Sequence, residues 1–352
     1  MFCSIDNRLW LGRWIILPLF IVMLIIVAGL RYGIGTDYWS YISIYQLAPR
    51  VSDIFSNSSG IAYIEPGFLL LNVISKALFG SFVGVATITC VIILFNIIRA
   101  CKRFQIDILL ALPIYVALFY LSHNFNIIRH GIAVSFVWVA FSYVSERKFF
   151  KFLLHVLAGA LFHKVALLAI PFYFFLNIRF KFWIIILVII VCYVLGLLVN
   201  IFNNPLLTIL LGDNEKFEFY VNDYYKNIGG NANFGLSIGT LLNIIWIFII
   251  YHKWFIKAKS NNLLLANALL FGVCAVGLFN KNGVFVERIS GLFYPSLIFI
   301  IPQFYLRFKK QWLILFAIMI YCLFYFVKVL SSKDRFGNYQ YIPYKTVFNE
   351  HL

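Results

Sequence analysis

The sequence predicts an all-α, polytopic integral membrane protein with about 10–12 transmembrane or re-entrant helices. Of its 352 residues, 63% are hydrophobic and 12% are charged, and the mean hydropathy is +0.92. A soluble domain of this length needs more charge to cover its surface, so lipid must solvate this chain. The apolar runs are long and continuous rather than alternating, which favours helices over the strands of a barrel.

We expect a span wherever an apolar run approaches the ~20 residues that a helix needs to cross a bilayer. The first run follows arginines and lacks a small-residue cleavage pattern, so it is predicted to be an uncleaved signal anchor with a cytoplasmic N-terminus. Residues 150–162 and 164–177 are short, and we expect them to form a hairpin that buries His163 partway into the membrane. The candidate segments are 14–30, 65–80, 82–98, 108–122, 128–144, 150–162, 164–177, 182–202, 236–252, 263–280, 289–306 and 311–329.

The formal charge of +16 comes from basic clusters between the apolar runs. This is the positive-inside distribution of cytoplasmic loops, so nucleic-acid binding is not expected. The same rule places the loop 203–235 and the C-terminal tail 331–352 outside, within a single membrane domain of residues 1–352. The clusters are Arg99/Lys102/Arg103, Arg147/Lys148/Lys151, Arg179/Lys181, Lys253/Lys257/Lys259 and Arg307/Lys309/Lys310.

Between residues 61 and 98, the number of membrane crossings that the positive-inside rule allows differs from the number of apolar segments. One crossing is allowed there, because Arg31 is expected outside and Arg99 inside, yet the sequence has two apolar segments. We therefore predict that segment 65–80 is re-entrant or strongly tilted.

The informative residues are isolated charges that the positive-inside rule places on the external face. A charge at the end of a membrane helix is costly unless it is paired or faces a polar cavity. The glycine-containing turn after the first span carries Arg31 and Asp37, which we expect to approach each other, with Tyr41 nearby. This group suits a sugar or phosphate site, and the alternative is a snorkelling arginine in an interfacial aromatic belt.

Further candidates lie at the ends of later segments. Glu65 precedes Pro66 at a helix start, where it is either a site residue or a complement to the helix dipole. Arg129 begins another helix beside His130, and a guanidinium suits bidentate contact with phosphate. His163 is a candidate general base, or else a structural histidine.

Glu287 and Arg288 are expected to open a helix over residues 289–305, either as an ion pair or with Arg288 reaching a ligand. Together Arg31, Arg129 and Arg288 predict a site for an anion with several phosphates. The sequence has no DxD cluster for a divalent metal, so neither a metal nor another cofactor is expected. Arginines would then stabilise the charge on a departing phosphate.

These residues resemble the pattern of the EpsG family of bacterial polysaccharide-repeat polymerases, which includes many Wzy O-antigen and capsule polymerases. The resemblance covers nearly the whole chain. The family more often has glutamine where this chain has His130, which leaves the role of that position open. The motifs that carry the resemblance are Arg31-x-Gly-x-Gly-x-Asp37 with Tyr41, Glu65-Pro66-Gly67-Phe68, Asn126-Ile-Ile-Arg129-x-Gly-Ile-Ala133, Arg147-Lys148, Phe162-His163-Lys-Val-Ala-Leu167, Arg288-Ile-Ser and Tyr341-Ile-Pro-Tyr344.

The resemblance implies a GT-C-like, metal-independent glycosyltransferase in the bacterial inner membrane, with its active site facing the periplasm. Such an enzyme transfers a glycan chain from undecaprenyl diphosphate onto the nonreducing end of a lipid-linked repeat unit, in O-antigen, capsule or exopolysaccharide synthesis. The implied partners are the lipid-linked donor and acceptor, membrane lipid, a chain-length regulator and a flippase.

The resemblance also implies roles for the candidate residues. Arg129, Arg288 and Arg31 would bind the diphosphates, and either His163 or Asp37 would deprotonate or position the acceptor hydroxyl. Two alternatives remain: another GT-C glycosyltransferase that uses a polyprenyl-phosphate sugar, and a flippase or transporter of lipid-linked oligosaccharides. The catalytic candidates are Arg129, His163, Asp37 and Arg288, and the substrate-binding candidates are Arg31, Tyr41, Glu65, His130, Glu287 and Tyr344.

Overall fold

The computed structural model describes residues 12–51, 64–198, 237–251, 260–281, 283–307, 311–334 and 336–349. Within these ranges the regular elements are helices, and two isolated β-bridges occur without any strand. The predicted all-α class is confirmed. The loop predicted over 203–235 lies outside the described residues.

Helix length and composition identify a membrane protein. Three of the described helices are long and apolar enough to cross a bilayer: α5 (Phe82–Phe104), most of α16 (Ser260–Leu278) and α19 (Gln311–Leu330). Shorter apolar helices of 10–17 residues accompany them. The other α-helices are α2 (Leu17–Gly29), α3 (Tyr38–Leu47), α4 (Pro66–Phe79), α6 (Ile108–Tyr115), α7 (Ile128–Phe141), α8 (Phe149–Ala160), α9 (Phe172–Phe175), α10 (Phe182–Leu198), α14 (Ile238–Tyr251), α17 (Gly283–Ser290) and α18 (Ser296–Tyr305).

The chain divides into two compact units. The first contains residues 1–143, 150–167 and 301–352, and the second contains residues 144–149 and 168–300. In the second unit, α10 and α14 both pack on α16. Asn267 of α16 is fully buried, and its amide donates hydrogen bonds to the carbonyls of Leu176 and Ile178. A polar side chain therefore fixes the segment that precedes α10 against the interior of this unit.

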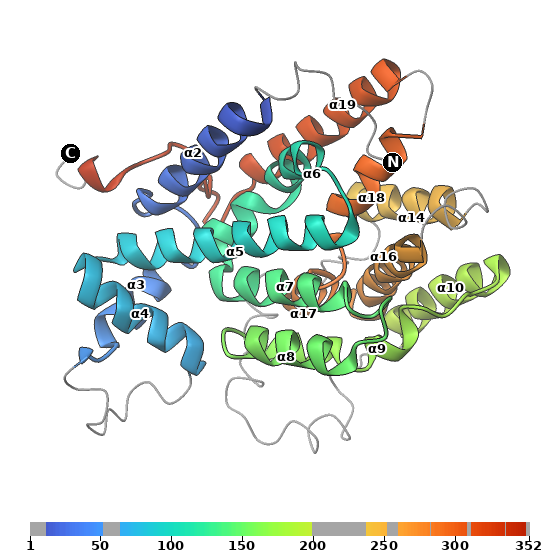
Figure 1. The fold of residues 1–352 in the computed structure, drawn as a ribbon, viewed down its shortest axis with the longest axis horizontal. Helices are drawn as coiled ribbons and strands as arrows, with labels where there is room; N and C mark the ends of the chain where they lie inside the picture. The colour runs from blue at the N-terminus through green and yellow to red at the C-terminus, as the bar shows by residue number, and fades with distance from the viewer. Residues whose placement is uncertain are drawn as a thin grey trace. The chain divides into compact units, whose positions relative to one another are not determined.

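In the first unit, α5 is the central helix and packs against α2, α4 and α7 (Figure 1). The beginnings of α5 and α7 lie at the same end, because Phe82 of α5 and Phe125, just before α7, both contact Arg31. At the opposite end, Arg103 of α5 donates a hydrogen bond to Ser142, which follows α7. We call these the Arg129 end and the Arg103 end.

Helix α4 begins and ends at the Arg129 end. Its N-cap residue Glu65 pairs with Arg129 at the start of α7. Its last residue is separated from the start of α5 only by Gly80 and Ser81. The re-entrant or strongly tilted placement of segment 65–80 in the membrane stays a prediction.

Two elements differ from the sequence-based expectation. The helix predicted over 289–306 is split, because α17 ends at Ser290 and the turn 291–295, with a glycine first and a proline last, precedes α18. Glu287 and Arg288 therefore lie in the last turns of α17, and the prediction that they open a helix is wrong. The short helix α3 was not predicted, because it has only 10 residues and follows a glycine-containing turn.

Candidate active site

The turn after α2 is fixed against the start of α7. Gly35 has φ of +98°, a conformation that residues other than glycine rarely adopt. An added Cβ there would clash with the Phe125 carbonyl and the Asn126 side chain. The next residue, Thr36, donates its backbone N–H to Asn126 Oδ1 at 3.0 Å. Glycine at this position lets the chain approach α7 and begin α3 at Tyr38.

Arg129 is the centre of the site. Its Nη1 donates to Glu65 Oε2 at 2.7 Å, and the side chains of Arg129 and Glu65 are 23% and 9% exposed. Arg129 also hydrogen-bonds with the buried Tyr41 of α3. Its guanidinium lies 5.8 Å from the ring centre of Phe68, and the rings of Phe68 and Tyr41 are in edge contact at 5.7 Å. Three segments far apart in the sequence, 38–47, 65–68 and 128–130, therefore converge here.

Arg31 is almost completely buried, with an exposed fraction of 1%. Its Nη1 donates to the Ala28 carbonyl, and its guanidinium lies 5.0–6.0 Å from the ring centres of Tyr38, Phe82 and Phe125. Burial lowers the pKa of Arg31 to about 10, so it stays protonated at neutral pH. The sequence suggested that Arg31 and Asp37 approach each other. The structure shows Arg31 held by aromatic rings, which stabilise a cation through cation–π attraction, and its approach to Asp37 stays a prediction.

Both arginines keep buried N–H donors that have no acceptor among the described residues. These donors are Nε of Arg129 and the Nε and Nη2 of Arg31. A buried guanidinium donor without an acceptor is uncommon in folded proteins, and anionic oxygens are its strongest acceptors. The arrangement is therefore chemically suited to an anion, with Glu65 balancing part of the charge.

Three histidines lie in a row beside Arg129. The ring centres of His123 and His130 are 6.2 Å apart, and those of His130 and His163 are 5.6 Å apart. The Nδ1 of His163 accepts a hydrogen bond from the backbone N–H of Val165, so in the neutral ring the proton is on Nε2. Burial, followed by the neighbouring His130, lowers the pKa of His123 to about 3. His123 was missed by sequence reasoning, because nothing in its local pattern places it beside His130.

The C-terminal segment also belongs to this end. Backbone hydrogen bonds join residues 340–347, which we call the tail clasp, to the turn 30–35. The bonds run from Tyr32 N to Lys345 O, from Gly35 N to Gln340 O and from Val347 N to Leu30 O.

Side chains extend the tail clasp onto neighbouring helices. Asn126 donates to Gln340 Oε1 and to the Tyr341 hydroxyl, and Tyr344 donates to the Val27 carbonyl. Sequence reasoning placed Arg31, Arg129 and the tail on one side of the membrane, and the structure brings them to one end of the first unit. Tyr344 contacts α2 there.

The remaining candidates occupy different positions. Asp37 is the N-cap residue of α3, one turn before Tyr41. Glu287 and Arg288 belong to α17 of the second unit. In the described part of the chain, no group of three or more His, Cys, Asp and Glu side chains is placed to hold a metal ion.

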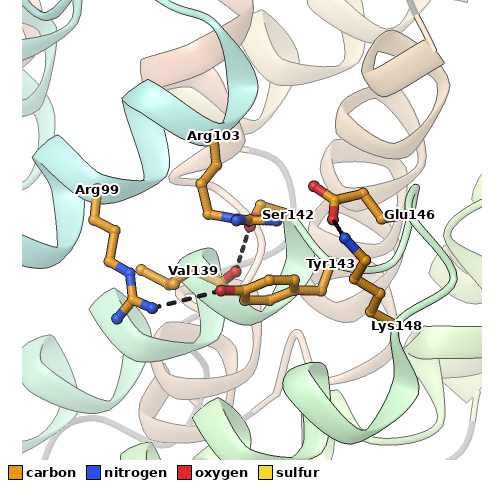
Figure 2. Close-up of polar contacts among 7 residues, drawn as sticks. All are labelled: Arg99, Arg103, Val139, Ser142, Tyr143, Glu146 and Lys148. Atoms are coloured by element: carbon orange, nitrogen blue, oxygen red, sulfur yellow. Dashed lines mark hydrogen bonds and ion pairs between the residues drawn. The ribbon is translucent and has the colours of Figure 1, made fainter.

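The Arg103 end has a different composition. Arg103 donates to the Ser142 hydroxyl at 2.5 Å, and its guanidinium lies 3.6 Å from the ring centre of Tyr143 (Figure 2). Arg99 donates to the Tyr143 hydroxyl at 3.4 Å. In the following loop, Lys148 pairs with Glu146 at 2.7 Å. This is the region that the positive-inside rule assigns to the cytoplasm.

Comparison with known protein families matches residues 14–346 to the EpsG family. The chain belongs to the EpsG family. EpsG proteins are a family of Wzy-like polymerases, so the chain is a membrane protein of a glycan-polymerase type. A comparison with curated proteins found no match, and neither did a comparison with solved structures.

Proposed function

We propose that this EpsG-family protein transfers a glycan chain from a polyprenyl diphosphate, in bacteria undecaprenyl diphosphate, onto the nonreducing end of a lipid-linked repeat unit. The proposal places the reaction at the periplasmic face of the inner membrane, without a metal ion or other cofactor. The observation that carries it is the Arg129–Glu65 pair, buried against Tyr41 and Phe68, whose guanidinium keeps a donor without an acceptor.

In this proposal the arginines bind the diphosphate. Arg129 is held at one nitrogen by Glu65, so the orientation of its planar guanidinium is fixed before substrate binds. The phosphate oxygens would accept from its remaining donor, and Arg31 would contribute after a rearrangement of its aromatic surroundings. Fixed donors of this kind stabilise the charge that develops on a leaving diphosphate. Arg288, on α17 of the second unit, stays a predicted diphosphate ligand on the family resemblance alone.

We assign deprotonation of the acceptor to Asp37 rather than to His163. In the neutral ring of His163 the proton is on Nε2, so this side chain is a hydrogen-bond donor at that nitrogen. It suits the positioning of a sugar hydroxyl or a phosphate. Asp37 lies one helical turn from Tyr41, and Tyr41 contacts Arg129. A carboxylate there can accept a proton near the diphosphate.

The proposed step is a single displacement. The acceptor hydroxyl oxygen forms a bond to the anomeric carbon of the donor glycan as the bond from that carbon to the diphosphate oxygen breaks. The hydroxyl proton passes to Asp37, and the electron pair of the broken bond stays on the polyprenyl diphosphate. Tyr41, Glu65, His130, Glu287 and Tyr344 are proposed to contact the sugars.

Arginine variants test the proposal in a strain that lacks the gene. Arg129→Ala and Arg288→Ala should leave the protein inserted and lower polymer formation about 100-fold or more, the effect of losing one transition-state donor. Arg13→Ala is the matched control, because Arg13 forms a surface ion pair with Asp107 and is 42% exposed. Full-length polymer from both site variants would contradict the arginine site.

Purified protein distinguishes the proposed class from its alternatives. With lipid-linked repeat units alone, it should produce a ladder of longer glycans without ATP or added metal. Addition of single sugars from a polyprenyl phosphate would indicate another GT-C glycosyltransferase. Translocation without growth of the glycan would indicate a flippase.

A further inference from the structure

An open pocket of about 410 Å³ lies between the tail clasp and the turn after α2. Its volume falls within the ~300–1,000 Å³ range of small-ligand pockets, which is enough for a ligand of monosaccharide or disaccharide size. None of the candidate site residues predicted from the sequence lines it. The lining residues are Gly33, Ile34, Gly337, Asn338, Tyr339, Gln340, Ile342, Pro343 and Lys345.

The lining suits a ligand rich in hydroxyl groups. Asn338 contributes an amide, which can donate and accept hydrogen bonds at once, as paired sugar hydroxyls do. The Gln340 amide accepts from Asn126 Nδ2 and donates to the Lys333 carbonyl, so it shapes the wall of the pocket. Gly33 and Gly337 have positive φ and no side chain, so polar backbone groups line the pocket with them. Ile34, Ile342 and Pro343 supply the apolar part of the lining beside these polar groups.

Aromatic rings stand at the edge of the pocket. Tyr339 lines it and is 52% exposed, with Lys333 Nζ lying 5.1 Å from its ring centre. Trp39 is also exposed, and its ring lies 3.7 Å from the position that a Cβ on Gly33 would occupy. Exposed aromatic side chains beside an amide suit a sugar ring, because the apolar face of a sugar can pack on an aromatic ring.

A hydrogen bond links the pocket to the segment that precedes Arg129. Gln340 of its lining accepts a hydrogen bond from Asn126 Nδ2 at 2.9 Å. Asn126 lies three residues before Arg129, and Gly35, whose N–H donates to Gln340 O, lies two residues before Asp37. A glycan held in the pocket would therefore extend from the residues proposed to carry out the transfer.

We propose that this pocket binds a sugar unit of the growing glycan chain adjacent to the unit being joined. The inference rests on the proposed polymerase function and adds a glycan subsite to it. A second point of attachment keeps the glycan near the active site between transfers, so the pocket should set how many repeats are added before release.

Binding tests the subsite without requiring transfer. The probes are oligosaccharides of one to several repeats, released from the polysaccharide of the strain that carries the gene. Purified Asn338→Ala/Tyr339→Ala protein should bind them about tenfold more weakly, which corresponds to about 1.4 kcal/mol. Phe336→Ala is the control, because Phe336 is 72% exposed in the same turn but does not line the pocket. Equal affinity of wild-type and double-variant protein would overturn the subsite.

A filling substitution provides an independent variant, in case the double variant fails to fold. Asn338→Trp should also weaken oligosaccharide binding, because the indole would occupy the pocket. Tyr339→Phe keeps the ring face and should retain most of the affinity. Unchanged affinity of the Asn338→Trp protein would equally overturn the proposal.

Product length separates failure of the subsite from failure of the proposed function. With lipid-linked repeat units, the Asn338→Ala/Tyr339→Ala protein should still join the first two repeats but give a ladder of shorter modal length. Arg129→Ala protein should give no joined product. Weakened oligosaccharide binding in the pocket variants, together with a full ladder from Arg129→Ala, would retain the subsite and reject the proposed active site. A normal ladder from pocket variants would reject the subsite alone.

Discussion

An arginine lies over an aromatic ring at each end of α7, Arg129 of α7 itself at one end and Arg103 of α5 at the other, yet the residues around the two guanidinium groups differ. At the Arg129 end, the guanidinium lies 5.8 Å from the ring centre of Phe68 and 2.7 Å from the carboxylate of Glu65. At the Arg103 end, the guanidinium lies 3.6 Å from the ring centre of Tyr143 and donates a hydrogen bond to the Ser142 hydroxyl (Figure 2). The ring contact alone therefore does not distinguish a site from a topological signal.

The two ends differ in the residues that surround each arginine. Glu65 is buried and Arg129 is mostly buried, so each depends on the other for its charge. Arg103 belongs to a cluster of basic residues that continues into the loop after α7, where charge is solvated. We infer that the Arg129 end is sensitive to single changes and that the Arg103 end tolerates them.

The largest expected effect comes from Glu65→Ala. It leaves the Arg129 charge buried without its carboxylate, which should cost about 3–5 kcal/mol of stability and abolish polymer formation. The double variant Glu65→Ala/Arg129→Ala removes both charges and should recover much of the stability while remaining inactive. Thermal midpoints in detergent and polymer gels measure the two effects. Additive losses of stability in the double variant would show that the pair is not coupled.

A smaller effect is expected from the pH dependence of His123. Its folded pKa of about 3 lies below the ~6.5 of an unfolded histidine, so between these values the unfolded state binds more protons. Stability should therefore fall as the pH is lowered from about 6.5, by about 2 kcal/mol at pH 5.

His123→Phe is the matched variant, because it keeps the ring stacked on Phe119 and removes the titrating group. Its thermal midpoint should fall less between pH 7.5 and pH 5 than that of the wild-type protein. Identical pH dependence of the two proteins would argue against a neutral, buried His123.

The smallest effect is expected from Arg103→Lys at the other end. Lysine keeps the positive charge that the topology requires but loses part of the contact with Tyr143, at about 1 kcal/mol or less. Polymer length should not change. The comparison partner is Arg129→Lys, which should lose polymer because lysine cannot replace a guanidinium fixed by Glu65. Loss of polymer from Arg103→Lys would remove the distinction between the two ends.

The sequence predicts most of the helices but not their tertiary relations. Continuous apolar runs are a strong local signal, so the helices containing Phe82–Phe104 and Gln311–Leu330 were expected. The break at residues 291–295 was not predicted. The run around it stays apolar, and this continuous hydrophobicity favoured one helix despite the glycine and proline within it. The helix α3 was not predicted, because its 10 residues are fewer than a membrane-spanning helix needs.

The site was predictable only in part. Arg129, Glu65 and Arg31 were predicted as site residues because they are isolated charges. The structure places Arg129 and Glu65 within hydrogen-bond distance of each other. The burial of Arg31 among aromatic rings was not predictable, because it depends on Phe82 and Phe125 arriving from other segments. His123 and the pocket beside the tail clasp escaped notice for the same reason. Such features arise from contacts across long sequence separations, which local patterns do not encode.

The tail clasp has a consequence for biosynthesis. Tyr344 and Val27, which it joins, are 317 residues apart. At about 5–20 residues per second, the ribosome needs roughly 15–60 s to make the chain between them. During that interval the turn after the first helix has none of its clasp hydrogen bonds, so the Arg129 end and its pocket reach their final form only after nearly all of the helices have been inserted. The protein would thus be assembled as a membrane bundle first and acquire its proposed glycan subsite last.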